Sequence, residues 1–141
     1  MYDPTNVFAR IIRSELPCFK VFENEHVLAF LDAFPTTPGH TLVIPKVTGF
    51  TDLFDLPEDA AAQLGSALPK VCRAVRAATG CEAVNIIQNC GPASGQAVPH
   101  PHFHIIPRFT GDNLIKHPTS SKNMIDRDTG NAMAEKIRAS L

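Results

Sequence analysis

Three of the six histidines in this chain stand at every second position of one short segment, VPHPHFHIIPR (98–108). They are His100, His102 and His104. Successive side chains of a β-strand point to opposite faces, so in a strand these imidazoles would share one face, with roughly 7 Å between neighbours. Neutral imidazole binds zinc, titrates near physiological pH and can act as a nucleophile or an acid. This segment is therefore the first candidate for chemistry.

Two kinds of functional site use such a strip of histidines. An H-x-H pair with a distant third histidine can hold zinc, since tetrahedral sites commonly take three protein ligands. Alternatively, neighbouring rings can be neutral and protonated at once, and a neutral ring can attack phosphorus. A polar, solvent-facing side of an edge strand is the third interpretation, because Pro99 and Pro101 cannot donate ladder hydrogen bonds. Three aligned histidines make it the least favoured.

The loop before the strip favours phosphate over metal. The segment QNCGPASGQ (88–96) holds two glycines and a turn proline, so its backbone can approach an anion closely and point N–H groups at it. Asn89 and Gln96 add neutral donors that suit phosphate oxygens. No carboxylate stands near the strip in the sequence, whereas metal-bound histidines usually donate to one. We therefore expect a phosphate site here.

The elements that position these residues follow from hydrophobic periodicity and turn signals. Strand patterns cover 18–24, 26–32, 40–46, 81–89 and 98–109, and helix patterns cover 4–14, 56–80 and 130–141. Pro4 and Pro57 suit first helical turns, Gly80 suits a helix end, and Pro69 predicts a kink or a break in the long helix. Residues 110–129 are expected to form a loop.

The sum is one α+β domain over residues 1–141, in which 110–141 form a loop and a C-terminal helix. We predict a sheet of about five antiparallel strands, two main helices on one side of it, and a tail helix. The prolines of the histidine segment predict that its strand has an unpaired edge.

The composition fits an ordinary soluble globular protein and excludes several classes of partner. The chain has 141 residues, 44% hydrophobic and 19% charged, with a formal net charge of −1, which suits one domain with a core. It has no basic run for nucleic acid, no apolar stretch that would span a membrane, and no secretory signal. Its four cysteines form no C-x-x-C pair, so we expect free buried thiols and a cytoplasmic location.

Several segments together resemble one known family. GQAVPHPHFHII resembles the signature of the histidine triad (HIT) superfamily of nucleotide hydrolases and transferases, with Pro101 in place of an aliphatic residue. VFARIIRSELPCFKVFENEHVLAFLDAFPTTPGHTLVIPK (7–46) resembles the N-terminal half of the family, and NCGPASGQ its phosphate loop. The long tail after IIPRF is similar to that of bacterial members. The resemblance implies the HIT-like fold and a homodimer.

The resemblance assigns roles to four histidines. His102 would be the nucleophile that attacks the α-phosphorus of a dinucleoside polyphosphate or nucleoside phosphoramidate, giving a nucleotidyl-histidine that water hydrolyses. His104 would lie against the phosphate and leaving group as donor or acid, while His100 and His40 would set the orientation of the nucleophile. Chemistry agrees, because one neighbour of a middle ring can orient it while the other serves the substrate. His26 and His117 match no motif and are expected at the surface.

The resemblance also implies a binding site for a purine nucleotide. Asp32 would accept hydrogen bonds from the ribose, although a local Asx turn before Phe34 is an alternative. Four apolar residues would line the base pocket, with ordinary core packing as an equal alternative: Val7, Phe8, Ile11 and Phe30. Phosphate contacts would come from the loop and the two residues after it: Asn89, Gly95, Gln96, Ala97 and Val98. Ala97 stands where relatives often carry a hydroxyl.

Many relatives bind structural zinc through an N-terminal C-x-x-C, and Asn6 and Ala9 stand at those places here. We therefore expect no metal and no required cofactor. Two other functions stay open on the sequence alone: a metal-binding module that uses the histidine strip, and a nucleotide-binding regulator with little turnover.

Overall fold

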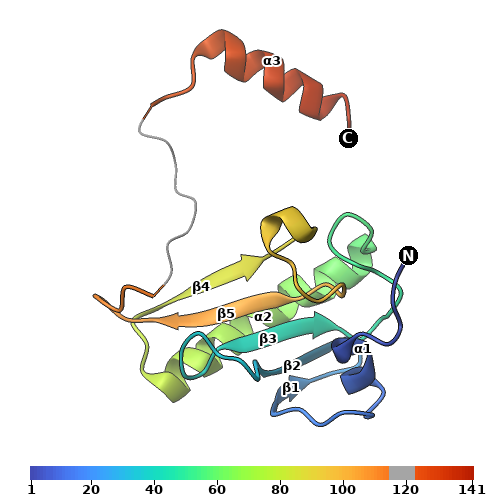
Figure 1. Cartoon of the computed structure of the whole chain (residues 1–141). Helices are drawn as coiled ribbons and strands as arrows, with labels where there is room; N and C mark the ends of the chain where they lie inside the picture. Colours follow the sequence, from blue (N-terminus) through green and yellow to red (C-terminus); the bar gives the residue numbers. More distant parts are fainter. Residues whose placement is uncertain (115–122) are drawn as a thin grey trace.

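The computed structural model describes residues 1–114 and 123–141. Its elements run in the order α1 (Val7–Ile12), β1 (Lys20–Glu23), β2 (Val27–Leu31), β3 (Thr41–Pro45), α2 (Glu58–Thr79), β4 (Ala83–Gln88), a 3-10 turn (Pro92–Ser94), β5 (Phe103–Arg108) and α3 (Arg127–Arg138). The five strands form one antiparallel sheet in the order β1-β2-β3-β5-β4 (Figure 1). This confirms the predicted α+β class and the five-stranded antiparallel sheet.

The helices do not lie on one side of the sheet as predicted. On one face, Val43 and Ile105 pack with Leu64 and Val71 of α2. On the other face, Phe8 of α1 forms a second apolar cluster with four strand residues: Leu28, Phe30, Leu42 and Ile44. The four residues Val27–Phe30 and all of β3 are buried, so these central strands lack the in–out alternation that marks a sheet with one wet face.

The histidine segment is a strand only in its second half. β5 begins at Phe103, and it lies between β3 and β4 rather than at an edge, so both the predicted start and the predicted unpaired edge are wrong. Pro99 and Pro101 precede the ladder, where their missing N–H groups leave no ladder bond unmade. The pairing of β5 with β3 and β4 begins only at Phe103, after the second proline.

Other prolines also differ from the sequence prediction. Pro4 lies outside α1, which begins at Val7 with Asn6 as its N-cap, and Pro57 is the N-cap residue of α2 rather than part of its first turn. Pro69 does not break α2, which runs from Glu58 to Thr79. The residue four before it is Gly65, whose permissive backbone can shift the carbonyl that the proline ring crowds.

One predicted helix boundary is confirmed, and the other differs by three residues. Gly80 ends α2 in the left-handed conformation, as expected. The tail helix starts at Arg127, before the predicted residue 130, because Asp126 caps it by accepting a hydrogen bond from the N–H of Thr129.

The predictions for cysteines and surface histidines have mixed outcomes. The four cysteines are free, although only Cys81 is buried. His26 is exposed as expected, and His117 lies outside the described residues. In the described part of the chain no helix has both the length and the apolar character needed to cross a membrane.

Candidate active site

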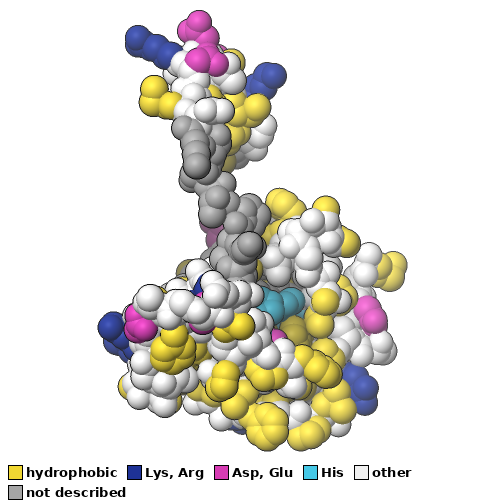
Figure 2. Space-filling view, turned by 60° about the vertical axis from the view of Figure 1, so that its left-hand side comes forward, with side chains coloured by type: hydrophobic (Ala, Val, Ile, Leu, Met, Phe, Trp, Pro, Cys, Tyr) yellow, Lys and Arg dark blue, Asp and Glu magenta, His cyan; other side chains and the backbone are white. Residues whose placement is uncertain are grey.

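A cavity of about 500 Å³ opens on the face of the sheet that carries α1. Figure 2 shows imidazole in a hollow surrounded by hydrophobic side chains. The lining residues come from α1, the segment before β1, the end of β2 and the loop after it, β3, the loop after β4 and the start of β5: Val7, Phe8, Ile11, Pro17, Cys18, Phe19, Phe30, Leu31, Asp32, Ala33, Phe34, Leu42, Asn89, Gly95, Ala97, Val98, His102 and His104.

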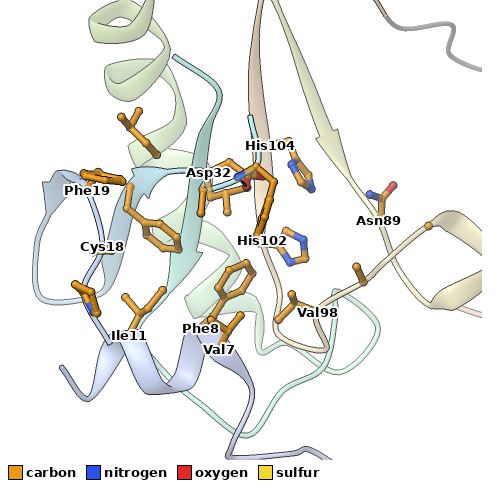
Figure 3. A pocket seen from close by; sticks show the side chains of 18 residues that line it. Val7, Phe8, Ile11, Cys18, Phe19, Asp32, Asn89, Val98, His102 and His104 are labelled. Atoms are coloured by element: carbon orange, nitrogen blue, oxygen red, sulfur yellow. Dashed lines mark hydrogen bonds between the residues drawn. The ribbon is translucent and has the colours of Figure 1, made fainter. Parts of the chain in front are cut away.

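Only two of the three aligned histidines reach this cavity. His102 and His104 line it, with ring centroids 5.0 Å apart (Figure 3). His100 is fully buried and contacts Tyr2 and Pro45 instead. β5 begins only at Phe103, so His100 and His102 both precede the strand and the predicted strip on one strand face is wrong for these two residues.

Backbone carbonyls fix the protons of His100 and His102. The Nε2 of His100 lies 3.0 Å from the carbonyl oxygen of Pro45, which can only accept, so Nε2 carries the hydrogen and Nδ1 is an acceptor. The Nδ1 of His102 lies 2.7 Å from the carbonyl oxygen of His100 and is a donor for the same reason. In the neutral ring of His102, Nε2 then has a free lone pair.

A second chain of hydrogen bonds gives His104 the tautomer opposite to that of His102. The N–H of Thr36 donates to Nδ1 of His40 over 3.0 Å, so the hydrogen of His40 sits on Nε2. That Nε2 lies 2.9 Å from Nδ1 of His104 and donates to it. The remaining nitrogen of His104, Nε2, therefore carries a hydrogen. The cavity holds one imidazole with a free lone pair beside one with a free N–H.

Burial keeps these rings neutral. It lowers the pKa of His100 to about 4, and the pKa of His104 to about 4 with help from the neighbouring rings of His102 and His40. Burial also lowers the pKa of His102 and of His40. Loss of water disfavours the charged form of imidazole, so all four rings are uncharged at neutral pH, as nucleophilic attack by one of them requires.

These lowered pKa values predict that the fold is destabilised by acid. Between pH 6.5 and about 4 the unfolded chain takes up protons that the folded chain does not, so the free energy of unfolding falls as the pH is lowered through that window. Each such histidine contributes about 1 kcal/mol per pH unit near pH 6. Denaturant titrations between pH 7 and 5.5, above most carboxylate titrations, measure this slope.

The matched pair for that experiment is His104→Gln and His26→Gln. The first variant is expected to have a shallower slope, and the second, at an exposed histidine, to keep the slope of the unaltered chain. An unfolding free energy that stays constant from pH 7 to 5.5 would contradict the neutral assignment.

Asp32 forms the local turn that the sequence left open as an alternative, and it also lies at the cavity. Its Oδ1 accepts a hydrogen bond from the N–H of Phe34, forming the local turn. Its Oδ2 lies 3.5 Å from Nε2 of His40, and the residue also lines the cavity. The expectation that no carboxylate lies near the histidines is therefore wrong, because β2 and β3 pair antiparallel and bring a residue distant in sequence alongside them.

The loop residues divide into two groups. Asn89, Gly95, Ala97 and Val98 line the cavity, and Figure 3 shows Asn89 across from the two histidines. Gln96 does not. Its Nε2 donates to the carbonyls of Thr51 and Val98, and its Oε1 accepts from the N–H of Gly91, so its amide holds the loop in shape.

The predicted apolar residues serve both the core and the cavity. Val7, Phe8, Ile11 and Phe30 all line it, and Phe8 is buried with its ring edge-on to His102 at 5.0 Å between centroids. Sequence reasoning missed several other lining residues, which continue the same segments: Pro17, Cys18, Phe19, Leu31, Ala33, Phe34 and Leu42.

The geometry does not favour a metal at the histidines. Asp32, His40 and His104 each offer a ligand atom, and these atoms lie within 4.8 Å of one another. A metal on Nε2 of His40 would move the ring hydrogen to Nδ1, where it would meet the N–H of Thr36. Two donors would then face each other without an acceptor.

Asn6 and Ala9, at the positions where many relatives carry the N-terminal zinc ligands, also do not suit a zinc ion. The side-chain oxygen of Asn6 accepts the helix-capping bond from Ala9, and its amide nitrogen donates to the carbonyl of Asp3. Ala9 has no ligand atom and is fully buried. These side chains begin a helix rather than ligate zinc.

The match to a known domain family decides the classification. The HIT domain model matches residues 13–111, which include His40, Asp32, the loop and both cavity histidines. The chain belongs to the HIT family. Among curated HIT relatives, protein hit of Bacillus subtilis is 45% identical over 103 residues, covering 73% of this chain and 70% of the relative.

Two further HIT relatives carry names that state an activity. An adenylylsulfatase of Arabidopsis thaliana is 41% identical and covers 77% of this chain and 54% of its own length. An adenosine 5'-monophosphoramidase of Saccharomyces cerevisiae is 40% identical, and the alignment covers 75% of this chain and 64% of the yeast protein. Among solved structures, a HIT family protein of Bacillus anthracis matches with a TM-score of 0.91 at 37% identity, covering 100% of this chain and 99% of that one.

Proposed function

We propose that this HIT protein hydrolyses nucleoside phosphate derivatives, dinucleoside polyphosphates or nucleoside phosphoramidates, through a covalent nucleotidyl-histidine at His102. The observation that carries the proposal is the pair of opposite tautomers in the cavity. The lone pair on Nε2 of His102 supplies a nucleophile, and the N–H on Nε2 of His104 supplies a donor beside it. The names of the plant and yeast relatives support an adenylyl group as the part transferred.

The first step uses both rings. Nε2 of His102 attacks the α-phosphorus, forming a phosphorus–nitrogen bond while the bond to the leaving group breaks. The positive charge that arises on His102 is stabilised by its Nδ1–H bond to the carbonyl of His100. His104 keeps its proton and donates a hydrogen bond from Nε2–H to the leaving group, which departs with the electron pair of the broken bond. No metal takes part in this step.

The second step restores the protein. Water attacks the same phosphorus, and the phosphorus–nitrogen bond breaks so that Nε2 of His102 recovers its lone pair. The nucleoside monophosphate is released, and the proton of the water passes to solvent. Asn89 and the backbone N–H groups of the loop, which lines the cavity, would stabilise the phosphoryl oxygens in both steps. Asp32 would accept hydrogen bonds from the ribose, and the apolar end near Phe8 and Phe30 would hold a purine.

We include a homodimer in the same proposal. β4 lies at one end of the strand order, Ile86 on it is exposed, and the buried Nε2 of Gln88 has no hydrogen-bond partner within the described part of the chain. A second copy that pairs along this strand would cover the apolar side chain and bring acceptors to this edge.

Trapping the intermediate tests the proposal. The protein is mixed with adenosine 5'-phosphoramidate or with a diadenosine polyphosphate, quenched in acid-free denaturant within seconds, and weighed intact. We expect a mass increase of one adenylyl group that disappears as the substrate is consumed. The same result is expected after treatment with a chelator.

Two outcomes would contradict the proposal. Binding of nucleotide without adduct or turnover would indicate a regulator. Activity that vanishes on chelation and returns with zinc would indicate that the histidines act as metal ligands. Adenosine, which has no phosphorus, serves as the blank.

A further inference from the structure

Tyr2, which lies outside the cavity lining, contacts the buried end of the histidine network. Its hydroxyl lies 2.8 Å from Nδ1 of His100, and the two ring centroids are 6.0 Å apart. It is the only tyrosine of the chain. Nothing in the sequence marks it as part of the site, because 98 positions separate it from its partner.

The direction of this hydrogen bond is determined. The Nε2 of His100 must donate to the carbonyl of Pro45, so its Nδ1 has a lone pair and no hydrogen. The hydroxyl of Tyr2 is therefore the donor. His100 is fully buried, so solvent does not reach it to replace this donor, and an unpaired nitrogen there would be costly.

The segment that follows the tyrosine is held by its own hydrogen bonds. The side chain of Asn6 donates to the carbonyl of Asp3 over 2.8 Å, and Arg13 donates to the carbonyl of Pro4 over 2.9 Å. Asp3 in turn accepts from the N–H of Thr5. These bonds fold residues 3–6, which directly follow Tyr2, into a turn.

We infer that Tyr2 is a positioning residue for the nucleophile. Together with the carbonyl of Pro45, its hydroxyl holds the ring of His100 in one orientation. The carbonyl of His100 accepts from the Nδ1–H of His102, so a shift of His100 would also move the acceptor that orients the nucleophile. This inference rests on the proposed function, since it assigns a purpose to the geometry of that nucleophile.

The variant Tyr2→Phe tests the hydroxyl alone. The phenyl ring keeps the packing on His100 while the donor to Nδ1 is lost. We expect kcat, and the rate of adduct formation, to fall roughly threefold to tenfold, the effect of about one neutral hydrogen bond, with KM little changed because Tyr2 does not line the cavity. Thr5→Val, which removes an exposed hydroxyl from the same segment, is expected to leave kcat unchanged.

A second readout does not depend on turnover. The ¹⁵N chemical shifts of His100 report its tautomer directly. In the unaltered protein they are expected to show hydrogen on Nε2 only. In Tyr2→Phe we expect a changed Nδ1 shift, because its hydrogen bond is lost, and a raised pKa of His100, because the donor that stabilised the neutral ring is gone. Tyr2→Leu, which also removes the ring, shows how much packing adds.

The outcomes separate this inference from the proposed function. If kcat and the ¹⁵N shifts of His100 are the same in Tyr2→Phe as in the unaltered protein, the inference is wrong. A fall in kcat that Thr5→Val reproduces would also overturn it, because it would reflect general loosening of the segment. If the unaltered protein forms no adduct, the proposed function fails, and the ¹⁵N shifts alone then decide whether Tyr2 fixes His100.

Discussion

Replacing His102 by glycine is expected to abolish the nucleotidyl adduct and to lower kcat by at least about 10⁴-fold, the scale on which loss of a nucleophile acts. No other histidine of the network can take its place. The free nitrogen of His104 carries a hydrogen, the Nε2 of His40 is engaged with His104, and both nitrogens of His100 are engaged away from the cavity. Single-turnover assays and intact mass measure both effects.

Two controls keep this experiment interpretable. His26→Gly removes a histidine from the exposed surface and is expected to keep full activity. Binding of adenosine monophosphate to His102→Gly is expected to persist, since Asp32 and the apolar lining remain in place. An adduct of normal mass in His102→Gly would show that another residue is the nucleophile.

Replacing Gly39 by alanine is expected to lower the free energy of unfolding by about 2–4 kcal/mol, from backbone strain and overpacking together. Gly39 has φ of +91°, and a Cβ there would lie 2.5 Å from Cγ2 of Thr79 at the end of α2 and 3.4 Å from the ring of Pro107. Because His40 follows directly, the displacement is also expected to reduce activity. Denaturant titration measures the stability loss.

A second substitution separates the two causes. Thr79→Ser deletes Cγ2 and keeps the oxygen, which bonds to Val75 and Cys81. In the double variant we expect about half of the lost stability to return. Gly49→Ala reports strain alone, since Gly49 has φ of +102° and nothing within 4 Å of its added Cβ. Equal losses for the two alanine variants, or no recovery with Thr79→Ser, would rule out the steric explanation.

Most of the fold is predictable from the sequence because its signals are local. The apolar runs around residues 27–31 and 41–45 and the glycine at position 80 each mark an element without reference to distant parts of the chain. The placement of α1 is not predictable in the same way. Strands β2 and β3 are buried on both faces, so their patterns carry no information about which face a helix covers.

The site is predictable where residues match a motif and unpredictable where they meet across the chain. His102, His104 and Asn89 are named by their pattern. The contact of Asp32 with His40 depends on strand pairing, and that of Tyr2 with His100 depends on a turn before α1. The pattern assigns Gln96 to phosphate because an amide donates equally well to an anion or to a carbonyl, and only geometry distinguishes the two.

The hydrogen bonds of Thr36, Pro45 and His100 to the histidines have an evolutionary consequence. In each of them the partner of the imidazole is a main-chain group. Any residue type would supply the two carbonyl groups, and any residue type except proline would supply the N–H at position 36. Substitutions elsewhere in the cavity can therefore change which leaving group fits without changing where the protons sit. Such a scaffold can diversify its substrates while inheriting one unaltered chemical step.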